Sequence, residues 1–350
     1  MSRCRKLVRW HALVAALGVV SFEMPIAVTA AASIVAGTAV NAVAGAAETP
    51  VVVRGAPSAL ERRDGYVDTG GAIIYYVTIG KGPPLVLLHG GPGSTHEYFL
   101  PYLLPLAKTR QLVLIDERGS GRSQRFDDDH TKYTLDAMAK DVEAVRVALN
   151  LGKMDLLGHS FGGILAQAVA INHPAGIRRL ILASTGSSAA RVNADFKMIK
   201  DSLDKDLRAR IDALEQRGII GPDGAQLPEY RRLADEAEAP YSYFVRPPAW
   251  DGAASPVGWD VLKQMWSATS DFHIDGNLAG FDFTPALRKL KIPALIIYGD
   301  HDMLTDATPQ QSHEALAGSV LVKIPRAAHM TMVDQNAAFI AAVARFLDGE

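Results

Sequence analysis

One serine of the chain stands in a setting that could make it a nucleophile. Ser160 is the middle residue of the pentapeptide GHSFG at 158–162, which follows an apolar run and opens a helix-like segment at 163–172. Glycines two positions before and after a serine leave room for a sharp turn between a strand and a helix. Such a turn exposes the hydroxyl at the helix N-terminus, where backbone N–H groups stabilise negative charge. The pattern therefore predicts nucleophilic chemistry at Ser160.

A general base and an orienting acid must accompany that serine, because a hydroxyl at its ordinary pKa is a weak nucleophile. Where a serine occupies this kind of turn, an acid and then a histidine follow it in the chain, each after a later strand. Here Asp300 and Asp302 follow an apolar run at 295–298, and His329 follows another at 320–324. We predict His329 as the base and Asp302 as the acid, because acids in such loops often stand three residues after a glycine. Asp300 is the alternative acid.

A glycine-rich turn could supply the hydrogen-bond donors that acyl transfer needs for its developing oxyanion. The sequence HGGPG at 89–93 directly follows an apolar run at 85–88. We predict that the Gly91 N–H forms the oxyanion hole together with the N–H of Phe161, the residue after the serine. A phosphate-binding loop is the alternative, but the segment lacks both the Gly-Lys-Ser/Thr of a P-loop and a G-x-G-x-x-G pattern.

Composition excludes several other kinds of site. The 350 residues are 48% hydrophobic and 21% charged, which is typical of a globular protein and rules out disorder, collagen-like repeats and a disulfide scaffold. A net charge of −2 without a basic stripe argues against nucleic-acid binding. Cys4 is the only cysteine, so the folded domain has no disulfide, Cys-ligated metal or cysteine nucleophile. His89, His159 and His301 show no zinc-binding spacing, and no metal site is predicted.

Hydrophobic periodicity predicts the elements that position these residues. Six short apolar runs indicate buried strands: 85–88, 112–115, 154–157, 180–182, 295–298 and 320–324. Runs that are apolar on both faces favour parallel strands covered by helices. A helical stripe at 135–149, with Thr134 as its N-cap, separates the second run from the third. We predict an α/β fold with a mostly parallel central sheet, helices on both faces, and an antiparallel hairpin of 66–68 and 73–78 at one edge.

The alternation of strands and helices breaks between 188 and 287. Charge-rich, helix-like segments at 194–217 and 229–238 occupy this stretch, which we predict to be a cap inserted between core segments 47–187 and 288–350. We expect some aromatic side chains here to form the core of the cap and the others to line an apolar pocket between cap and sheet. The aromatic residues are Tyr230, Tyr241, Tyr243, Phe244, Trp250, Trp259, Trp266, Phe272, Phe281 and Phe283.

The N-terminal residues 1–46 are predicted to be a secretory leader. Four basic residues precede an apolar run at 12–20, and small residues at 42–46 resemble a small-x-small cleavage site. A transmembrane anchor is the alternative, but Glu23 and Pro25 interrupt the run well short of the ~20 apolar residues that span a bilayer. We therefore expect a periplasmic or secreted protein without a membrane span after leader removal.

Several of these segments together resemble a known family. The segments at 89–93, 116–123 (DERGSGRS) and 158–163, with Asp302 and His329, are similar to those of the α/β-hydrolase superfamily, and specifically its prolyl aminopeptidase (proline iminopeptidase) group. The resemblance implies release of an N-terminal proline or other residue from a small molecule or short peptide through an acyl-enzyme, without metal or organic cofactor. It further implies that 116–123 is a structural loop in which Arg118 forms a buried ion pair.

The resemblance also suggests how a substrate amine is bound. Members of that group hold the amine with acidic side chains, one of them in a cap segment similar to G-P-N-E-F-x-x-x-G-x-L. Residues 268–278 read ATSDFHIDGNL, so Asp271 stands where that glutamate would be. Its carboxylate is one methylene shorter, and Ala-Thr replaces Gly-Pro. Asp271 is thus the predicted substrate-binding residue, with a capping or surface ion-pair role as the alternative.

Two other functions are compatible with these residues. One is an esterase, lactonase or amidase that acts on a small apolar acyl compound and has no requirement for an amine. The other is a non-catalytic ligand-binding protein on the same fold. The complete set of Ser160, Asp302 and His329 argues against this last alternative.

Overall fold

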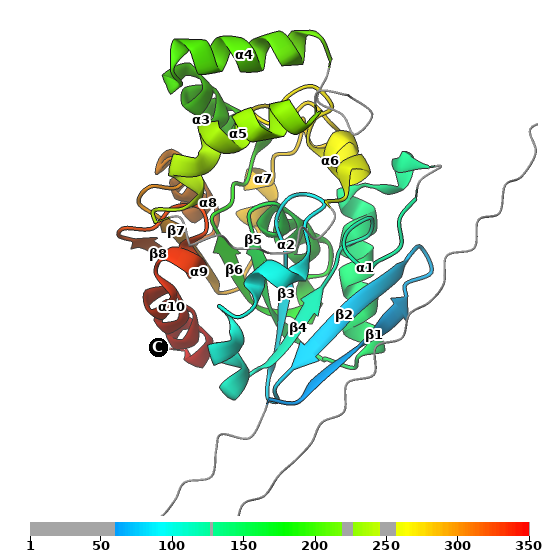
Figure 1. Ribbon diagram of the computed structural model, residues 1–350. Helices are drawn as coiled ribbons and strands as arrows, with labels where there is room; N and C mark the ends of the chain where they lie inside the picture. The colour runs from blue at the N-terminus through cyan, green and yellow to red at the C-terminus, as the bar shows by residue number, and fades with distance from the viewer. Residues whose placement is uncertain (1–59, 127–128, 219–226, 246–256, 350) are drawn as a thin grey trace, which may run out of the picture. The chain divides into compact units, whose positions relative to one another are not determined.

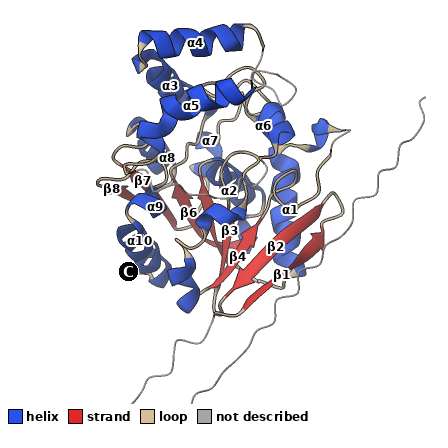
Figure 2. Ribbon diagram, in the orientation of Figure 1, coloured by secondary structure: helices blue, strands red, loops and turns tan. Residues whose placement is uncertain are grey.

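The central sheet orders eight strands as β1-β2-β4-β3-β5-β6-β7-β8 in the computed structural model, which describes residues 60–126, 129–218, 227–245 and 257–349 (Figures 1 and 2). The strands are β1 (Arg62–Asp68), β2 (Ile73–Ile79), β3 (Pro84–Leu88), β4 (Gln111–Ile115), β5 (Met154–His159), β6 (Ile177–Ala183), β7 (Ala294–Gly299) and β8 (Val320–Ile324). The pairs β1–β2 and β2–β4 are antiparallel, and all other neighbours are parallel. The predicted α/β class and the edge hairpin are confirmed.

Apolar side chains on both faces of each central strand form two core layers. In β3, Leu85 and Leu87 contribute to one layer and Val86 and Leu88 to the other, because successive side chains of a strand point to opposite faces. Helices cover both faces: α1 (Leu135–Ala148), α2 (Phe161–Asn172) and α8 (Ala307–Ala315) on one, and α10 (Asn336–Asp348) on the other. The predicted N-cap of α1 is confirmed, since the Thr134 side chain accepts the Ala137 N–H at 3.2 Å.

Short helical turns complete the described part of the sheet domain. They are η1 (His96–Phe99), η2 (Leu104–Lys108), η3 (His130–Lys132), η4 (Pro174–Gly176), α7 (Thr284–Leu287) and α9 (Thr331–Asp334). Of these, η1 follows the glycine-rich turn after β3, and α9 follows His329. Both turns therefore lie beside predicted site residues.

The long connection between β6 and β7 is helical. It contains α3 (Ala189–Ser202), α4 (Lys205–Gln216), α5 (Leu227–Ser242) and α6 (Trp259–Met265), which Figure 1 shows together at one end of the sheet. The predicted helix-like segment at 194–217 is helical but divided, because Leu203 is extended and the Asp204 side chain caps a new helix by accepting the N–H groups of Asp206 and Leu207. The boundaries of the predicted cap and core stay predictions.

The last predicted strand differs from expectation in its burial. Val320 is 48% exposed, although the run at 320–324 was expected to be buried. Val320 is exposed because β8 is the last strand of the sheet and pairs only with β7. The predicted leader, 1–46, lies outside the described residues. Within the described ranges, the helices are too short or too polar to cross a membrane.

A buried ion pair anchors the loop at 116–123 to α1. Arg118 donates through Nε and Nη2 to the Asp141 carboxylate at 2.6 and 2.8 Å, and both side chains are buried. This geometry confirms the expected structural role of Arg118. The loop that follows β4 is thereby held against the helix that precedes β5.

Removing one partner of this pair should destabilise the fold strongly. In an Asp141→Ala variant the Arg118 guanidinium stays buried without its counter-charge, which costs about 3–5 kcal/mol of the free energy of unfolding in urea. The control is Asp136→Ala on the same helix, whose pair with Lys140 is exposed and should be worth less than about 1 kcal/mol. Equal losses in both variants would contradict a specific role for the buried pair.

Candidate active site

Ser160 lies on a strained turn between β5 and α2. Its φ of 57° and ψ of −123° are unusual for a residue with a side chain. The Ser160 N–H donates to the Ala183 carbonyl at 3.0 Å, and the Ser160 carbonyl accepts the Gly163 N–H at 2.9 Å. A Cβ at Gly158 would overlap the Gly162 carbonyl oxygen, and a Cβ at Gly162 would overlap the Leu88 carbonyl oxygen, so both flanking glycines are required by the close approach of α2 to the strands. The predicted sharp turn is thus present.

The loops after β7 and β8 bring Asp302 and His329 into contact. The His329 ring lies with Nδ1 2.8 Å from Asp302 Oδ1, which also accepts the Leu304 N–H at 3.1 Å. Burial alone would raise the pKa of the Asp302 carboxyl, but the adjacent His329 imidazole holds that pKa below its usual value. Asp302 is therefore an acceptor that can orient the histidine ring.

The alternative acid, Asp300, has other partners. Its Oδ1 lies 2.6 Å from Nδ1 of the exposed His301 ring and accepts the Ala327 N–H at 3.2 Å. The side chain of Asp300 helps to hold the loop at 325–328, and the carboxylate in contact with His329 belongs to Asp302.

Both predicted oxyanion donors lie close to the serine turn: Gly91 in the cavity lining and Phe161 directly after Ser160. Gly91 lines the same cavity as Ser160 and has a φ of 119°, which favours glycine. Phe161 buries its ring in the core, while its N–H lies at the open N-terminal end of α2, where helix amides lack helical partners. The adjacent Gly90 packs directly against Ser160, since a Cβ there would lie 3.0 Å from the serine Cβ.

A buried pair beneath the glycine-rich turn supports its backbone. The His89 ring contacts the Gly90 carbonyl through Nδ1 at 2.8 Å and forms an ion pair with Glu117 through Nε2. The Glu117 carboxylate also accepts the His89 N–H at 3.0 Å. The segments at 89–93 and 116–123 are therefore one structural unit.

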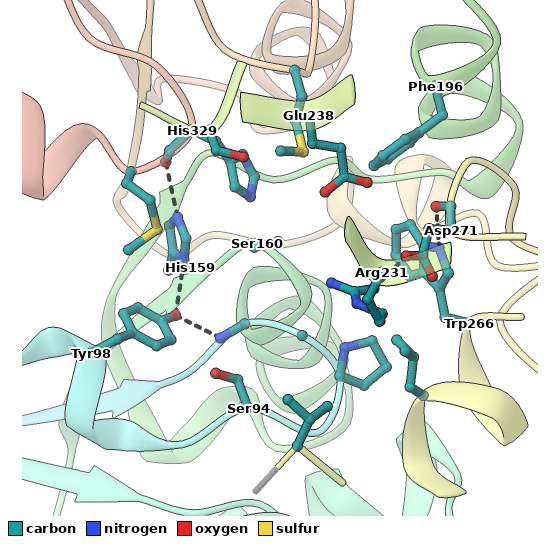
Figure 3. Close-up of a pocket in the computed structure, with 18 of the residues that line it drawn as sticks. Ser94, Tyr98, His159, Ser160, Phe196, Arg231, Glu238, Trp266, Asp271 and His329 are labelled. Atoms are coloured by element: carbon teal, nitrogen blue, oxygen red, sulfur yellow. Dashed lines mark hydrogen bonds and ion pairs between the residues drawn. The ribbon is translucent and has the colours of Figure 1, made fainter. Parts of the chain in front are cut away.

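A cavity of about 390 Å³ opens above the serine between the sheet and the cap helices. Figure 3 shows His159 and His329 on one side of this cavity and Arg231, Trp266 and Asp271 on the other, with Ser160 between the two groups. Among the described residues, no three His, Cys, Asp or Glu side chains gather in a way that could hold a metal ion.

The predicted aromatic lining is present in part. Tyr243, Trp259 and Trp266 line the cavity, whereas Tyr230 and Phe272 are buried within the cap. Trp250, the remaining tryptophan of that segment, lies outside the described residues. These three rings line the cavity together with Phe196 of α3, which was not among the predicted aromatic residues.

Asp271 lies at the cavity, but it already has a cation as its partner. Its carboxylate forms an ion pair with Arg231 of α5, which also donates to Asp235 at 3.1 Å and lies over the Trp259 ring. Burial raises the pKa of the Asp271 carboxyl, while the positive charge of Arg231 opposes that shift. Asp271 therefore lines the cavity and forms an ion pair, and its predicted role in binding a substrate amine stays a prediction.

Glu238 is a cavity residue that the sequence analysis did not single out. Figure 3 shows its carboxylate pointing into the cavity from α5. Burial and the negative charge of Asp271 raise its pKa to about 8. The helical spacing contained a signal, because Arg231, Asp235 and Glu238 stand at i, i+4 and i+7 and so share one face of α5. The sequence pattern at 229–238 indicated only a charge-rich helix of the predicted cap.

The α5 helix is also tied to the loop that carries His329. The His329 N–H donates to the Tyr241 carbonyl and the Met330 N–H to the Ser242 carbonyl, both at 2.9 Å. At the end of this helix the Phe244 N–H donates to Asp334, which also accepts the Ala328 N–H. The helix that presents Glu238 and Arg231 therefore ends directly on the backbone of the histidine loop.

Comparison with known proteins agrees with this arrangement. A family model described as alpha/beta hydrolase fold matches residues 83–335. The chain is 31% identical over 295 residues to a proline iminopeptidase of Heyndrickxia coagulans, covering 81% of this chain and 98% of that protein. It is 32% identical over 284 residues to a proline iminopeptidase of Lactobacillus helveticus, with 78% and 94% covered.

A solved structure is similar as well. The crystal structure of a proline iminopeptidase of Mycobacterium smegmatis matches with a TM-score of 0.71 at 25% identity, covering 82% of this chain and 98% of that one. Together, the sheet, the serine turn and the family match define a hydrolase of the α/β-hydrolase fold. Within that fold family, the chain belongs to the proline iminopeptidase group, as its motifs predicted.

The two aspartates after β7 provide a matched test of the acid. Asp302→Asn should lower kcat on an aryl ester by about 10⁴-fold, because the amide favours the wrong histidine tautomer. Asp300→Asn should stay within a few fold of the wild type, since Asp300 contacts a different histidine. If Asp300→Asn were the more damaging change, the assignment of the acid would be wrong. Melting temperatures of both variants show whether a loss of activity reflects unfolding.

Proposed function

We propose that this hydrolase is a serine aminopeptidase that releases the N-terminal residue of a short peptide or amide through an acyl-enzyme. Ser160 is the nucleophile, His329 the general base and Asp302 its orienting acid. The backbone N–H groups of Gly91 and Phe161 form the oxyanion hole. The shared cavity of Ser160 and His329, the contact between His329 and Asp302, and the similarity to proline iminopeptidases support this proposal.

In the proposed reaction, His329 carries the proton both when the acyl-enzyme forms and when water hydrolyses it. His329 Nε2 accepts the Ser160 hydroxyl proton while Oγ attacks the scissile carbonyl carbon, and the carbonyl oxygen becomes an oxyanion that accepts the two backbone N–H groups. The protonated imidazole then gives that proton to the leaving amine as the C–N bond breaks. Water, deprotonated by the same imidazole, attacks the ester carbon, and Ser160 recovers its proton when the free acid departs.

The observation that carries the aminopeptidase assignment is the position of Glu238. The described residues give this carboxylate no ion pair or hydrogen bond, while the nearby Arg231 is already paired with Asp271 and Asp235. An unpaired carboxylate in a desolvated cavity is unfavourable, which is why its pKa is raised to about 8. A substrate ammonium group placed beside Glu238 would supply the missing counter-charge.

A panel of matched substrates tests this specificity. Proline and alanine arylamides, their N-acetylated forms and short-chain aryl esters should be compared under the same conditions. We expect turnover of the free-amine arylamides to fall by about 10- to 150-fold on N-acetylation, the range of one charge-assisted hydrogen bond of about 1.5–3 kcal/mol. Equal activity on free and acetylated amides, or activity on esters alone, would instead favour the esterase, lactonase or amidase alternative.

Substitution of the carboxylate locates the amine site within the cavity. Glu238→Gln should lower kcat/KM for free-amine arylamides by about 10- to 150-fold while sparing aryl esters. The matched control is Glu236→Gln on the same helix, whose side chain is exposed and pairs with Arg232. Asp271→Asn should also weaken amine substrates selectively, because it leaves the Arg231 charge unneutralised beside the ammonium group.

The pH dependence gives a second readout for Glu238. Its carboxyl is protonated below about pH 8, so the anionic, amine-binding form grows as the pH rises towards that value. Between about pH 6 and 8, kcat/KM for an arylamide should therefore rise more steeply than for an ester. The Glu238→Gln variant should lose this difference. A uniform effect of Glu238→Gln on both substrate types would contradict the amine-binding role.

The enzyme is further proposed to act outside the cytoplasm. The support is the basic, apolar and small-residue pattern of 1–46. N-terminal sequencing of protein recovered from cell fractions should find a periplasmic or secreted form that begins after about residue 46. A full-length form confined to the cytoplasm would contradict export.

A further inference from the structure

A buried chain of hydrogen bonds joins the three loops that carry the proposed catalytic groups. The Gly90 N–H donates to Tyr98 Oη at 2.6 Å, Tyr98 Oη lies 2.8 Å from His159 Nδ1, and His159 Nε2 lies 3.0 Å from the His329 carbonyl oxygen. Figure 3 shows these contacts as a continuous line along one wall of the cavity. Tyr98, His159 and His329 are all buried.

The chemistry of the end groups sets the direction of every bond in the chain. A carbonyl oxygen can only accept, so His159 must carry a hydrogen on Nε2 to contact His329. The Gly90 amide can only donate, so it donates to the Tyr98 oxygen. Tyr98 then gives its own hydrogen to the unprotonated Nδ1 of His159, which completes a single consistent arrangement.

His159 is neutral in this arrangement. Burial and the neighbouring His329 lower the pKa of its imidazole to about 3. With both ring nitrogens engaged and no accessible ionisation near neutral pH, His159 is not a second general base. His159 stands immediately before the proposed nucleophile. Its contacts with Tyr98 and with the His329 carbonyl connect the backbone after β3 to the backbone after β8.

We propose that Tyr98 and His159 are positioning residues that hold the oxyanion loop and the histidine loop in register with Ser160. This inference rests on the proposed serine mechanism. The His329 carbonyl is held by His159 and its N–H by Tyr241 of α5, so the backbone on both sides of the base is fixed. The contact with Tyr98 also occupies the Gly90 amide, which leaves the next amide, that of Gly91, for the oxyanion.

The hydrogen-bonded chain through Tyr98 and His159 should affect kcat, because catalysis requires the serine, the base and the oxyanion donors to be placed precisely relative to one another. Ser160 and the Phe161 N–H follow β5, whereas the base follows β8 and the Gly91 N–H follows β3, so the proposed catalytic groups come from three strand ends. A displacement of about 1 Å in a reacting group can cost about 10²-fold in rate. A positioning role therefore predicts losses in kcat, with KM nearly unchanged because the cap side of the cavity keeps its contacts with substrate.

Three substitutions test the proposal on an aryl ester and an arylamide. Tyr98→Phe removes one hydroxyl, and His159→Leu removes both ring contacts; each should lower kcat by about 10- to 100-fold on both substrates with KM within about threefold. His159→Gln should recover most of the loss, because its amide offers an acceptor for Tyr98 and a donor for the His329 carbonyl. Tyr102→Phe is the control, since Tyr102 lies close in sequence but outside the cavity lining.

The outcomes separate this proposal from simple destabilisation. A kcat within about threefold of the wild type in Tyr98→Phe would overturn it, as would a His159→Gln variant no better than folded His159→Leu. Circular dichroism and melting temperature show whether His159→Leu folds. If it does not, the kcat values of Tyr98→Phe and His159→Gln, compared with that of the Tyr102→Phe control, still test the proposal. Full activity in Ser160→Ala would instead refute the serine mechanism itself, whatever the Tyr98 and His159 variants show.

Discussion

The strained turn at Ser160 is the constraint on which the rest of the site depends. A serine with φ of 57° is held between β5 and α2 because Gly158 lets α2 approach β5 closely and Gly162 lets it approach the end of β3. Such a backbone conformation costs of order 1–3 kcal/mol and persists where the surrounding structure over-determines it. Here the surrounding structure is a fully buried strand and a nearly all-apolar helix, which together fix the hydroxyl at the helix N-terminus.

Parallel strand order brings the other groups to that turn. The neighbours β3 and β6 flank β5, and their C-terminal ends contribute the glycine-rich turn and the Ala183 carbonyl that holds the serine amide. Asp302 and His329 follow β7 and β8, and α5 ends on the backbone of the loop that carries His329. The helix that carries Glu238 and the loop that carries His329 are therefore connected by direct hydrogen bonds, so under the proposed function α5 contributes to the position of the base as well as to amine binding.

The sequence predicted the parts that obey local rules and missed those that depend on packing. The serine turn, the six strands and the contact between Asp302 and His329 follow from short motifs and from strand order. The positions of Glu238 and Tyr98 in the cavity could not be predicted in the same way, because each depends on which face of an element meets a cavity formed by distant segments. The exposure of β8 was missed for a related reason, since an apolar run does not reveal whether its strand lies at a sheet edge.

The claim that Ser160 forms a covalent intermediate is the centre of this account. Reaction with an alkyl fluorophosphonate, followed by intact-protein mass spectrometry and peptide mapping, tests it most directly. We predict one adduct per chain, located on Ser160, with loss of hydrolysis in proportion to labelling, and no adduct in Ser160→Ala. Hydrolysis that persists after complete labelling, or an inactivating adduct on another residue, would contradict the account.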